Sequence, residues 1–210
     1  MHADALQGGD GMKVLLVSAN TLTSPYPVYP IGLDYVAGAL CESHAVEILD
    51  LNAAQNEDAI EDAIEDAIGR FEPDLIGISL RNIDSTDIVD IQSYLTGYRD
   101  LVREIRGHST ALIVLGGSGF TIFPRRILQA VGADFGIVGE GERLGLLIEA
   151  LENGTDPCRV AGVVTTGAAA QLPPPYEPAL RRDFQPTRPH LGYYLKYGAM
   201  LNLQSKRGCP

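Results

Sequence analysis

The sequence predicts an α/β domain in which helices cover both faces of a parallel β-sheet. Short apolar runs alternate five times with segments in which apolar residues recur at helical spacing. The runs are apolar at consecutive positions, as expected of strands that are buried on both faces. Parallel strands must be joined by crossover segments, usually helices, so five βα units in series indicate a doubly wound sheet.

Each expected strand is an apolar run that ends at a polar or glycine-rich loop. The five runs span residues 13–17, 45–49, 74–79, 111–115 and 135–138. Their number and spacing favour the flavodoxin-like (Rossmann-like) strand order 2-1-3-4-5. In this layout ligands bind beyond the carboxyl ends of the strands, beside the first and third strands.

The first two helices follow from their apolar stripes and end signals. Apolar residues at helical spacing mark the first helix within residues 33–40. Asn56 is a suitable N-cap for the second helix, and Gly69 lies near its end. One face of this second helix carries Ile60, Ile64 and Ile68.

The three later helices are predicted in the same way. A long third helix is expected from about Asp87 to Arg106, with Ile91 facing inward. Pro124 suits the first turn of the fourth helix. Apolar spacing within residues 144–151 marks the fifth helix, with Gly154 as its expected C-cap.

The remaining segments divide the chain around this domain. We expect a flexible leader at residues 1–11 and the main domain at residues 12–157. A small hairpin turned by Gly167 follows at residues 158–172, then an extended proline-rich linker at 173–198 and the truncated start of a further domain at 199–210. The linker assignment depends on six prolines within residues 173–189.

Composition excludes several classes of protein. A formal net charge of -11 argues against a nucleic-acid partner, which needs clustered lysine and arginine. No apolar run reaches the roughly 18 residues that a membrane span needs. Residues 1–11 lack the basic and apolar regions of a signal peptide. The odd number of cysteines, three, favours the reducing cytoplasm over a disulfide framework.

Four loops at the expected carboxyl ends of the strands are the candidate binding site. Adjacent glycines after a buried strand allow a ligand to approach the backbone, because no Cβ intervenes. The candidate cofactor-binding residues are Asn20, Thr21, Pro25 and Tyr26 after the first strand, Ser79, Leu80, Arg81 and Asn82 after the third, Gly116, Gly117, Ser118 and Gly119 after the fourth, and Gly139, Glu140 and Gly141 after the fifth.

Other kinds of site lack their sequence marks. No GxGxxG follows the first strand and no GxxxxGK[ST] is present, which argues against common nucleotide folds. The first strand is not followed by paired acids, and the third ends in Ser79 where a receiver domain has aspartate. The four histidines show no metal-ligand spacing, and no catalytic triad is apparent.

Taken in order, several short motifs resemble a known family. They are Pro-x-Gly-Leu-x-Tyr at 30–35, Pro-Asp-Leu-Ile-Gly-Ile-Ser at 73–79, Gly-Gly at 116–117, Val-Gly-Glu-Gly-Glu at 138–142 and Arg-Gly-Cys-Pro at 207–210. This order resembles the N-terminal B12 (cobalamin)-binding domain of the cobalamin-dependent radical S-adenosylmethionine (SAM) enzymes. That family includes methyltransferases and anaerobic magnesium-protoporphyrin IX monomethyl ester cyclases.

The resemblance implies a corrinoid that lies across the carboxyl edge of the sheet. Its nucleotide tail would enter near Ser79 and Gly116–Gly117. One B12 pattern, DxHxxG with a histidine on cobalt, is missing, because residues 18–24 read Ser-Ala-Asn-Thr-Leu-Thr-Ser. Many radical SAM members also lack this histidine, so the resemblance implies base-off cobalamin without a histidine ligand.

For the intact enzyme the resemblance implies a [4Fe–4S] cluster and SAM in a downstream domain of the same chain. Cys209 would be the first cysteine of CxxxCxxC and one of three cluster ligands. The cluster would reduce SAM to a radical that abstracts hydrogen from substrate, before methyl transfer or other corrinoid chemistry. One cysteine cannot hold a cluster, so the 210 residues alone are expected to bind and not to catalyse.

Two alternatives stay open at this point. The missing histidine also fits a corrinoid-free docking domain that keeps the fold. A flavin- or nucleotide-binding flavodoxin-like protein is the third hypothesis, and flavin absorbance would favour it.

Overall fold

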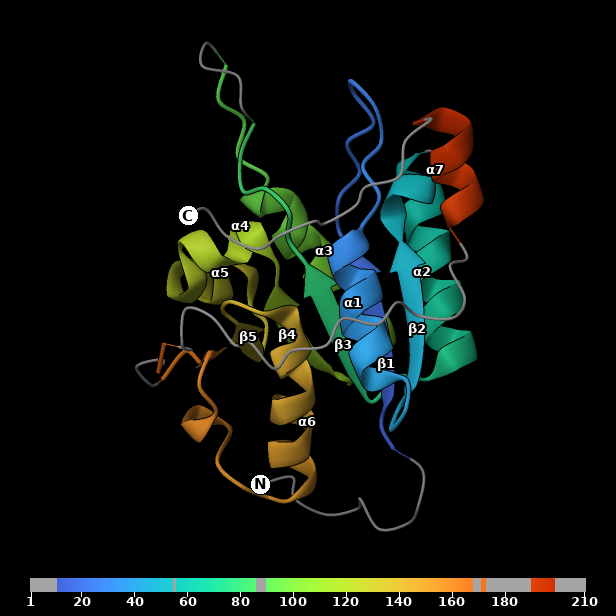
Figure 1. The fold of residues 1–210 in the computed structure, drawn as a ribbon. Coiled ribbons are helices and arrows are strands. Elements are labelled where there is room, and N and C mark those ends of the chain that lie inside the picture. Colours follow the sequence, from blue (N-terminus) through green and yellow to red (C-terminus); the bar gives the residue numbers. More distant parts are fainter. Residues whose placement is uncertain (1–10, 55, 86–89, 168–170, 173–189, 199–210) are drawn as a thin grey trace, which may run out of the picture.

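A computed structural model describes residues 11–54, 56–85, 90–167, 171–172 and 190–198. In this part of the chain one sheet has the strand order β2-β1-β3-β4-β5-β6 (Figure 1). The strands are β1 (Lys13–Ser18), β2 (Ala45–Asp50), β3 (Leu75–Ser79), β4 (Leu112–Gly116), β5 (Phe135–Ile137) and β6 (Val163–Val164). The first five are parallel in the order 2-1-3-4-5, which confirms the predicted doubly wound class.

The sixth strand is a difference from the expected five. Within the segment 158–172, Val163–Val164 pairs antiparallel with β5 and joins the main sheet, where a separate hairpin was predicted. Both valines are at most 1% exposed, so pairing with β5 buries apolar surface that a small hairpin would leave in water. Gly162 N–H still donates to Gln171 O at 2.7 Å, a contact across the predicted hairpin.

Helices cover the two faces of the sheet unequally. On one face lie α1 (Ile31–Leu40) and α6 (Leu144–Glu152), in front of the sheet in Figure 1. The other face is covered by α2 (Glu57–Phe71), α3 (Leu95–His108), α4 (Ser118–Ile122) and α5 (Pro124–Val131). Short 3-10 turns lie at η1 (Leu51–Ala53), η2 (Gly141–Arg143) and η3 (Pro157–Arg159).

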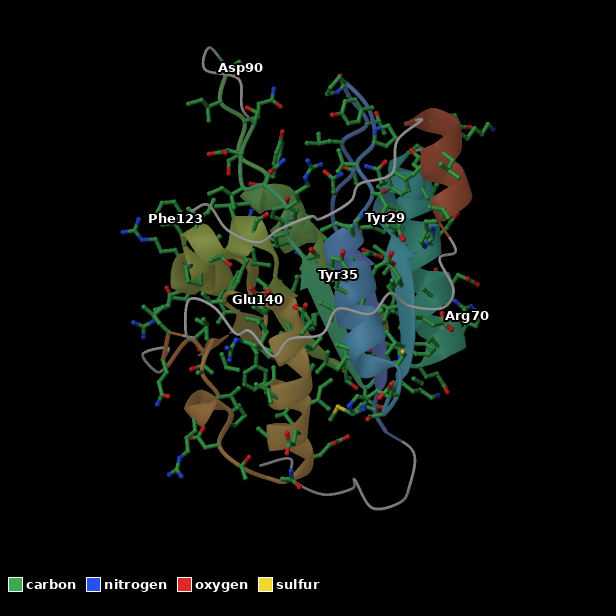
Figure 2. The ribbon with its side chains drawn as sticks, viewed as in Figure 1. Tyr29, Tyr35, Arg70, Asp90, Phe123 and Glu140 are labelled. Carbon is green, nitrogen blue, oxygen red and sulfur yellow. The ribbon has the colours of Figure 1, made fainter. Side chains whose placement is uncertain are left out.

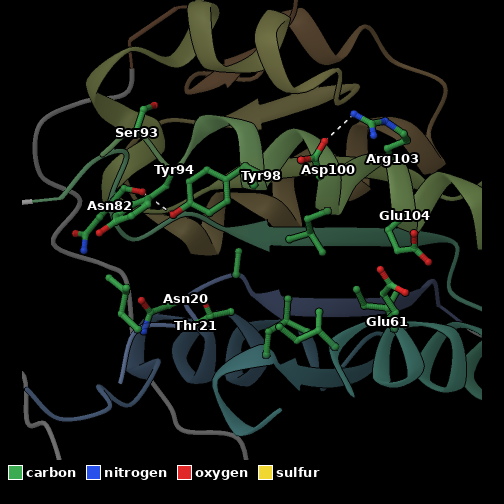
Figure 3. A pocket seen from close by; sticks show the side chains of 17 residues that line it. Asn20, Thr21, Glu61, Asn82, Ser93, Tyr94, Tyr98, Asp100, Arg103 and Glu104 are labelled. Carbon is green, nitrogen blue, oxygen red and sulfur yellow. Dashed lines mark hydrogen bonds and ion pairs between the residues drawn. The ribbon is translucent and has the colours of Figure 1, made fainter. Parts of the chain in front are cut away.

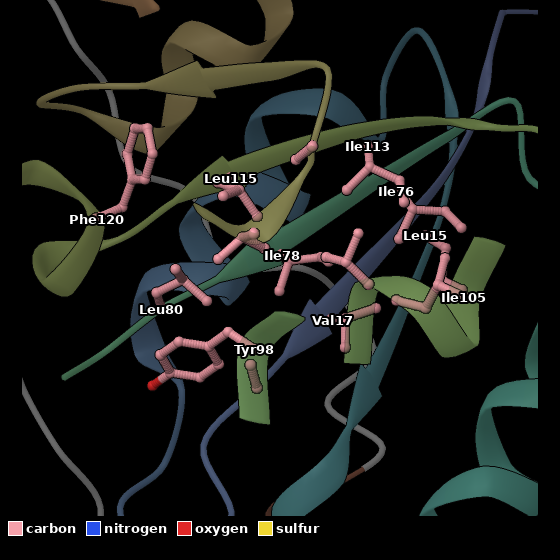
Figure 4. Close-up of a cluster of buried hydrophobic side chains, with 14 of the residues drawn as sticks. Leu15, Val17, Ile76, Ile78, Leu80, Tyr98, Ile105, Ile113, Leu115 and Phe120 are labelled. Atoms are coloured by element: carbon pink, nitrogen blue, oxygen red, sulfur yellow. The ribbon is translucent and has the colours of Figure 1, made fainter. Parts of the chain in front are cut away.

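The larger core lies between the sheet and the α2/α3/α5 layer (Figure 4). Alternate residues of β1, β3 and β4 point into it because side chains of a strand alternate between faces. Phe120 from α4 is fully buried, and a Cβ on Gly136 would lie only 2.1 Å from its ring. Glycine in β5 therefore lets the Phe120 ring rest directly on the strand.

Helix α2 has the predicted cap. The Asn56 side chain accepts a hydrogen bond from Ala59 N–H at 2.8 Å, which satisfies a free donor of the first turn. The helix continues to Phe71, two residues beyond Gly69, and ends at Glu72 in the left-handed region.

The third helix begins later than predicted. It starts at Leu95, because an antiparallel bridge pairs Asp84 with Ser93 and so keeps Ser93 out of the helix. Tyr94 N–H also donates to Ile83 O at 2.9 Å. Ile91, expected to face inward, is 69% exposed on this loop. Residues 86–89 lie outside the described residues.

Part of the predicted linker 173–198 is helical. Residues 191–197 form α7 (Leu191–Tyr197), which packs near the carboxyl end of β2 (Figure 1). Tyr194 on this helix is fully buried, and that burial favours docking over extended chain. Residues 173–189, most of the leader and the segment 199–210 with Cys209 lie outside the described residues.

Candidate functional site at the carboxyl edge of the sheet

Three small residues lie side by side where β1, β3 and β4 end. Ser18 pairs in register with Ser79, and Ser79 with Gly116. Their positions belong to the face covered by α1 and α6, because Ser18 and Gly116 each follow by two residues a core residue of that face, Leu16 and Val114. A Cβ added to Gly116 would meet no atom within 4 Å. The upper end of this face is therefore open next to the backbone of β4.

The neighbouring Gly117 is in a different position. Its φ is 94°, and a Cβ would lie 2.5 Å from Leu80 O. Gly119 N–H donates to the same carbonyl at 2.9 Å, and a Cβ on Gly119 would lie 3.0 Å from the Asn82 carbonyl carbon. These two glycines therefore hold the turn after β4 against the chain that leaves β3. Of the predicted Gly-Gly pair, only Gly116 faces open space.

The chain after β3 is held at both sides. Ser118 Oγ donates to Arg81 O at 2.9 Å, and Tyr98 OH donates to Asn82 O at 2.6 Å. Burial is the largest cause that raises the pKa of Tyr98 to about 12, so this hydroxyl stays a donor at neutral pH. The Arg81 side chain is exposed at the edge, and Leu80 is fully buried. Beyond these residues the loop that carries Asp90 projects away from the sheet (Figure 2).

The turn after β5 uses its glycines for geometry. Gly139 is exposed and has a φ of 88°, a conformation that favours glycine. A Cβ on Gly141 would lie 2.7 Å from Val36 Cγ2, so glycine lets η2 approach α1 closely. Glu140 between them is half-buried. Arg143, at the end of this turn, is buried and donates to Ala161 O at 3.1 Å.

The loop after β1 has one buried and several exposed members. Asn20 is 8% exposed, and its Nδ2 is buried without a hydrogen-bond partner among the described residues. Thr21, Pro25 and Tyr26 are exposed. Because an unpaired buried donor is costly, the Asn20 amide is a group that a bound molecule would stabilise.

A groove of about 620 Å³ lies between α2 and α3 (Figure 3). At the carboxyl edge it is lined by Asn20, Thr21 and Asn82 from the predicted site. Apolar side chains that line it include Leu51, Ile64 and Leu101. Charged residues along it are Glu61, Glu104 and the Asp100–Arg103 ion pair at 2.7 Å.

The structure thus distributes the predicted residues over two faces of the sheet. Ser79 and Gly116 belong to the α1/α6 face, whereas Asn20, Thr21 and Asn82 line the groove on the opposite face. Ser93 and Tyr94 also line this groove, although both fall inside the helix that the sequence predicts from about Asp87. The bridge that removes them from that helix leaves no mark in the apolar periodicity.

No group of three side chains suited to hold a metal ion occurs among the described residues. His44 directly precedes β2 at the opposite edge of the sheet, and His108 ends α3. His190 Nε2 lies 3.2 Å from Ile48 O. Where the structure describes the chain, no helix is long and apolar enough to cross a membrane.

Comparison with known proteins decides the family. The model of the B12-binding domain matches residues 17–146, which is more than half of the chain. The chain belongs to the B12-binding domain family. The matched range includes all four loops of the candidate site, and the resemblance to this family found in the sequence is confirmed.

Relatives of known structure or activity agree with this family. The radical S-adenosylmethionine methyltransferase TsrM from Kitasatospora setae, solved with cobalamin and a [4Fe-4S] cluster bound, is 30% identical, with a TM-score of 0.70 over 80% of this chain and 32% of that one. Tryptophan 2-C-methyltransferase from Streptomyces laurentii is 28% identical over 131 residues, which is 62% of this chain and 21% of that protein.

A more distant structure has the same fold. The cobalamin-dependent S-adenosylmethionine radical enzyme OxsB, with aqua-cobalamin bound, is 20% identical, with a TM-score of 0.55 over 73% of this chain and 20% of that one. The chain therefore spans about a third or less of the length of each of these relatives.

Proposed function

We propose that this domain binds cobalamin, with the corrinoid across the carboxyl edge of the sheet. The observation that carries the proposal is the open backbone at Gly116, where an added Cβ would meet nothing within 4 Å. Ser18 and Ser79 next to it in register are also small. A flat macrocycle with a nucleotide tail needs such a stretch of backbone that is not blocked by side chains.

The polar groups at this edge suit a corrinoid as well. The periphery of a corrin ring carries amide groups that both donate and accept hydrogen bonds. The buried Asn20 Nδ2 lacks an acceptor among the described residues, and Arg81 is exposed at the same edge. Both side chains are placed to donate to amide oxygens. We assign them, with Thr21 and Asn82, to the rim of the site.

The corrinoid would be held without a histidine on cobalt, in the base-off form. The loop after β1, where a cobalt-binding histidine occurs in other B12 proteins, begins with Ala19, Asn20, Thr21 and Leu22. Bound cobalamin would supply a cobalt centre able to carry a methyl group, and this domain would hold and orient it.

The intact protein is proposed to be a radical SAM enzyme, with methyl transfer favoured by the methyltransferase relatives. Its downstream domain would supply the [4Fe–4S] cluster, with Cys209 among the ligands, and bind SAM. Several segments at the carboxyl edge carry an exposed apolar side chain that a partner domain could cover. Among the described residues these include Leu22, Tyr26, Ile91, Ile122, Phe123, Leu195 and Tyr197. The free thiols Cys41 and Cys158 suit a cytoplasmic setting.

Titration of the purified chain with hydroxocobalamin, followed by the visible spectrum and by co-elution on a sizing column, tests the proposal. Gly116→Leu should lower the affinity by at least about tenfold, since its side chain would fill the open space. Gly107→Leu is the matched control, because Gly107 also has no atom within 4 Å of an added Cβ but lies near the end of α3.

The two variants separate the possible outcomes. Loss of binding in Gly116→Leu alone, with an unchanged far-ultraviolet circular dichroism spectrum, supports the site. A wild-type chain that leaves the corrinoid spectrum unchanged and does not co-elute with it contradicts cobalamin binding. That result would favour the corrinoid-free docking domain.

A further inference from the structure

We propose that Tyr194 and Asn52 are positioning residues that fix the loop after β1, residues 19–30, through helix α7. The inference rests on the proposed function, because this loop carries Asn20, Thr21, Pro25 and Tyr26 of the corrinoid site. Helix α7 lies more than 140 residues later in the chain, yet it contacts both this loop and the end of β2.

The contact begins with a buried hydrogen bond to a carboxylate. Tyr194 is fully buried, and its hydroxyl donates to Asp50 Oδ2 at 2.6 Å. Asp50 is only 2% exposed, and its other oxygen accepts from Asn52 N–H at 3.2 Å. A buried carboxylate must be hydrogen-bonded to be tolerated, so the Tyr194 hydroxyl contributes to holding α7 on the end of β2.

From α7 the network continues into the loop at its near end. Tyr193 OH donates to Asn52 Oδ1 at 3.1 Å. The Nδ2 of the same Asn52 side chain donates to Leu22 O at 2.9 Å. Asn52 is 2% exposed, so this side chain is a buried bridge between α7 and the loop. Leu22 follows Asn20 and Thr21 directly, which places the bridge next to two proposed corrinoid contacts.

A second connection holds the far end of the loop. The Tyr29 ring contacts the Tyr194 ring edge-on, with centroids 5.2 Å apart, and Tyr29 OH donates to the buried Asp34 at the start of α1. A Cβ on Gly198, directly after α7, would lie 3.2 Å from Pro27 O. Tyr29, labelled in Figure 2, thus anchors the loop where it enters α1.

Both ends of the loop are therefore connected to one helix, while Pro25 and Tyr26 between them are exposed. An exposed loop tip with few packing contacts of its own is ordered only by its anchors. In the proposed site, α7 determines where Asn20, Thr21 and Tyr26 lie. Correct placement of binding residues before the ligand arrives raises affinity, because less ordering is needed on binding.

One variant weakens the attachment of α7 to β2, and a second removes the bridge from α7 to the loop. Tyr194→Phe deletes the hydroxyl on Asp50 and keeps the ring against Tyr29, whereas Asn52→Ala deletes the bridge to Leu22. Hydrogen–deuterium exchange of the loop peptide covering residues 19–29, measured in the 210-residue chain without ligand, reports loop order. We expect this peptide to exchange up to about tenfold faster in Tyr194→Phe, because loss of a hydrogen bond to a charged group weakens the anchor that orders the loop.

Hydroxocobalamin affinity is measured in the same variants. We expect a loss of about tenfold with little change in the urea midpoint of unfolding, because the core layers do not depend on α7. The matched control is Tyr197→Phe, which removes a hydroxyl from an exposed residue of the same helix. Tyr197→Phe should leave both loop exchange and affinity at the wild-type value.

The outcomes distinguish this inference from the proposed function. Wild-type loop exchange in both Tyr194→Phe and Asn52→Ala overturns the inference, and so does faster exchange with wild-type corrinoid affinity. If the wild-type chain binds no corrinoid, the proposed function fails, and the exchange measurement alone then decides whether α7 orders the loop. Faster exchange together with weaker binding supports both.

Discussion

Replacement of Gly117 by alanine is predicted to destabilise the domain far more than the same replacement at Gly116. The two glycines are adjacent after β4, and the sequence does not distinguish them. Gly117 has φ 94° and ψ 171°, a region of backbone space that is essentially limited to glycine. Gly116 has no positive φ, and an added Cβ there meets no atom within 4 Å.

The expected magnitude follows from two contributions. A non-glycine residue in this backbone region costs about 1–3 kcal/mol. The new Cβ would also lie 2.5 Å from Leu80 O, so this carbonyl must move and its 2.9 Å bond from Gly119 N–H weakens. Loss of one such bond costs about 1 kcal/mol. Together Gly117→Ala should lower the free energy of unfolding by about 2–4 kcal/mol.

Urea unfolding followed by circular dichroism measures this effect. With a slope of about 2 kcal/mol per molar urea, the midpoint should fall by roughly 1–2 M. Gly116→Ala should stay within about 1 kcal/mol of wild type and is expected to stabilise slightly, by restricting the unfolded chain. Equal midpoints for the two alanine variants would refute the argument that Gly117 supports the chain leaving β3.

Two further predictions concern the helices next to the groove. Asn56→Ala should lower the free energy of unfolding by about 1 kcal/mol, since Ala59 N–H loses its cap, and urea unfolding checks this; no change would mean that water replaces the cap fully. The fold raises the pKa of Tyr98 to about 12, above the value of about 10 for an unperturbed tyrosine. The protonated Tyr98 hydroxyl therefore contributes fully to the free energy of unfolding below about pH 10, and this contribution is lost as the pH rises toward 12. The free energy of unfolding, measured from about pH 9 to 12, should therefore fall less steeply with pH in Tyr98→Phe than in wild type. Parallel curves for the two proteins would contradict the raised pKa of Tyr98.

Elements governed by burial on both faces could be predicted from the sequence. Val14 to Val17 of β1 and Leu75 to Ile78 of β3 are all buried, so their continuous apolar runs identified them as central strands. The Asn56 cap was also predictable, because its hydrogen bond is local. Features that depend on distant contacts were not, such as the docking of α7 through Tyr194 and the pairing of β6 with β5.

The candidate site was predictable as a set of loops but not as a geometry. Family resemblance and strand order together indicated the carboxyl edge. They did not separate Gly116, which is open, from Gly117, which supports Leu80, because that difference lies in the sign of φ and in a contact with the chain that leaves β3. The groove between α2 and α3 was also missed, since it requires the late start of α3 at Leu95.

The antiparallel strand β6 affects how the domain behaves at high concentration. An outermost strand with unpaired backbone groups can recruit a strand from another molecule and start aggregation. Next to β5 that position is already taken by Val163–Val164, which offers only two residues of backbone and runs opposite to its neighbour. Self-templated growth of the sheet past β6 is therefore disfavoured, which protects the apolar strands behind it from intermolecular pairing.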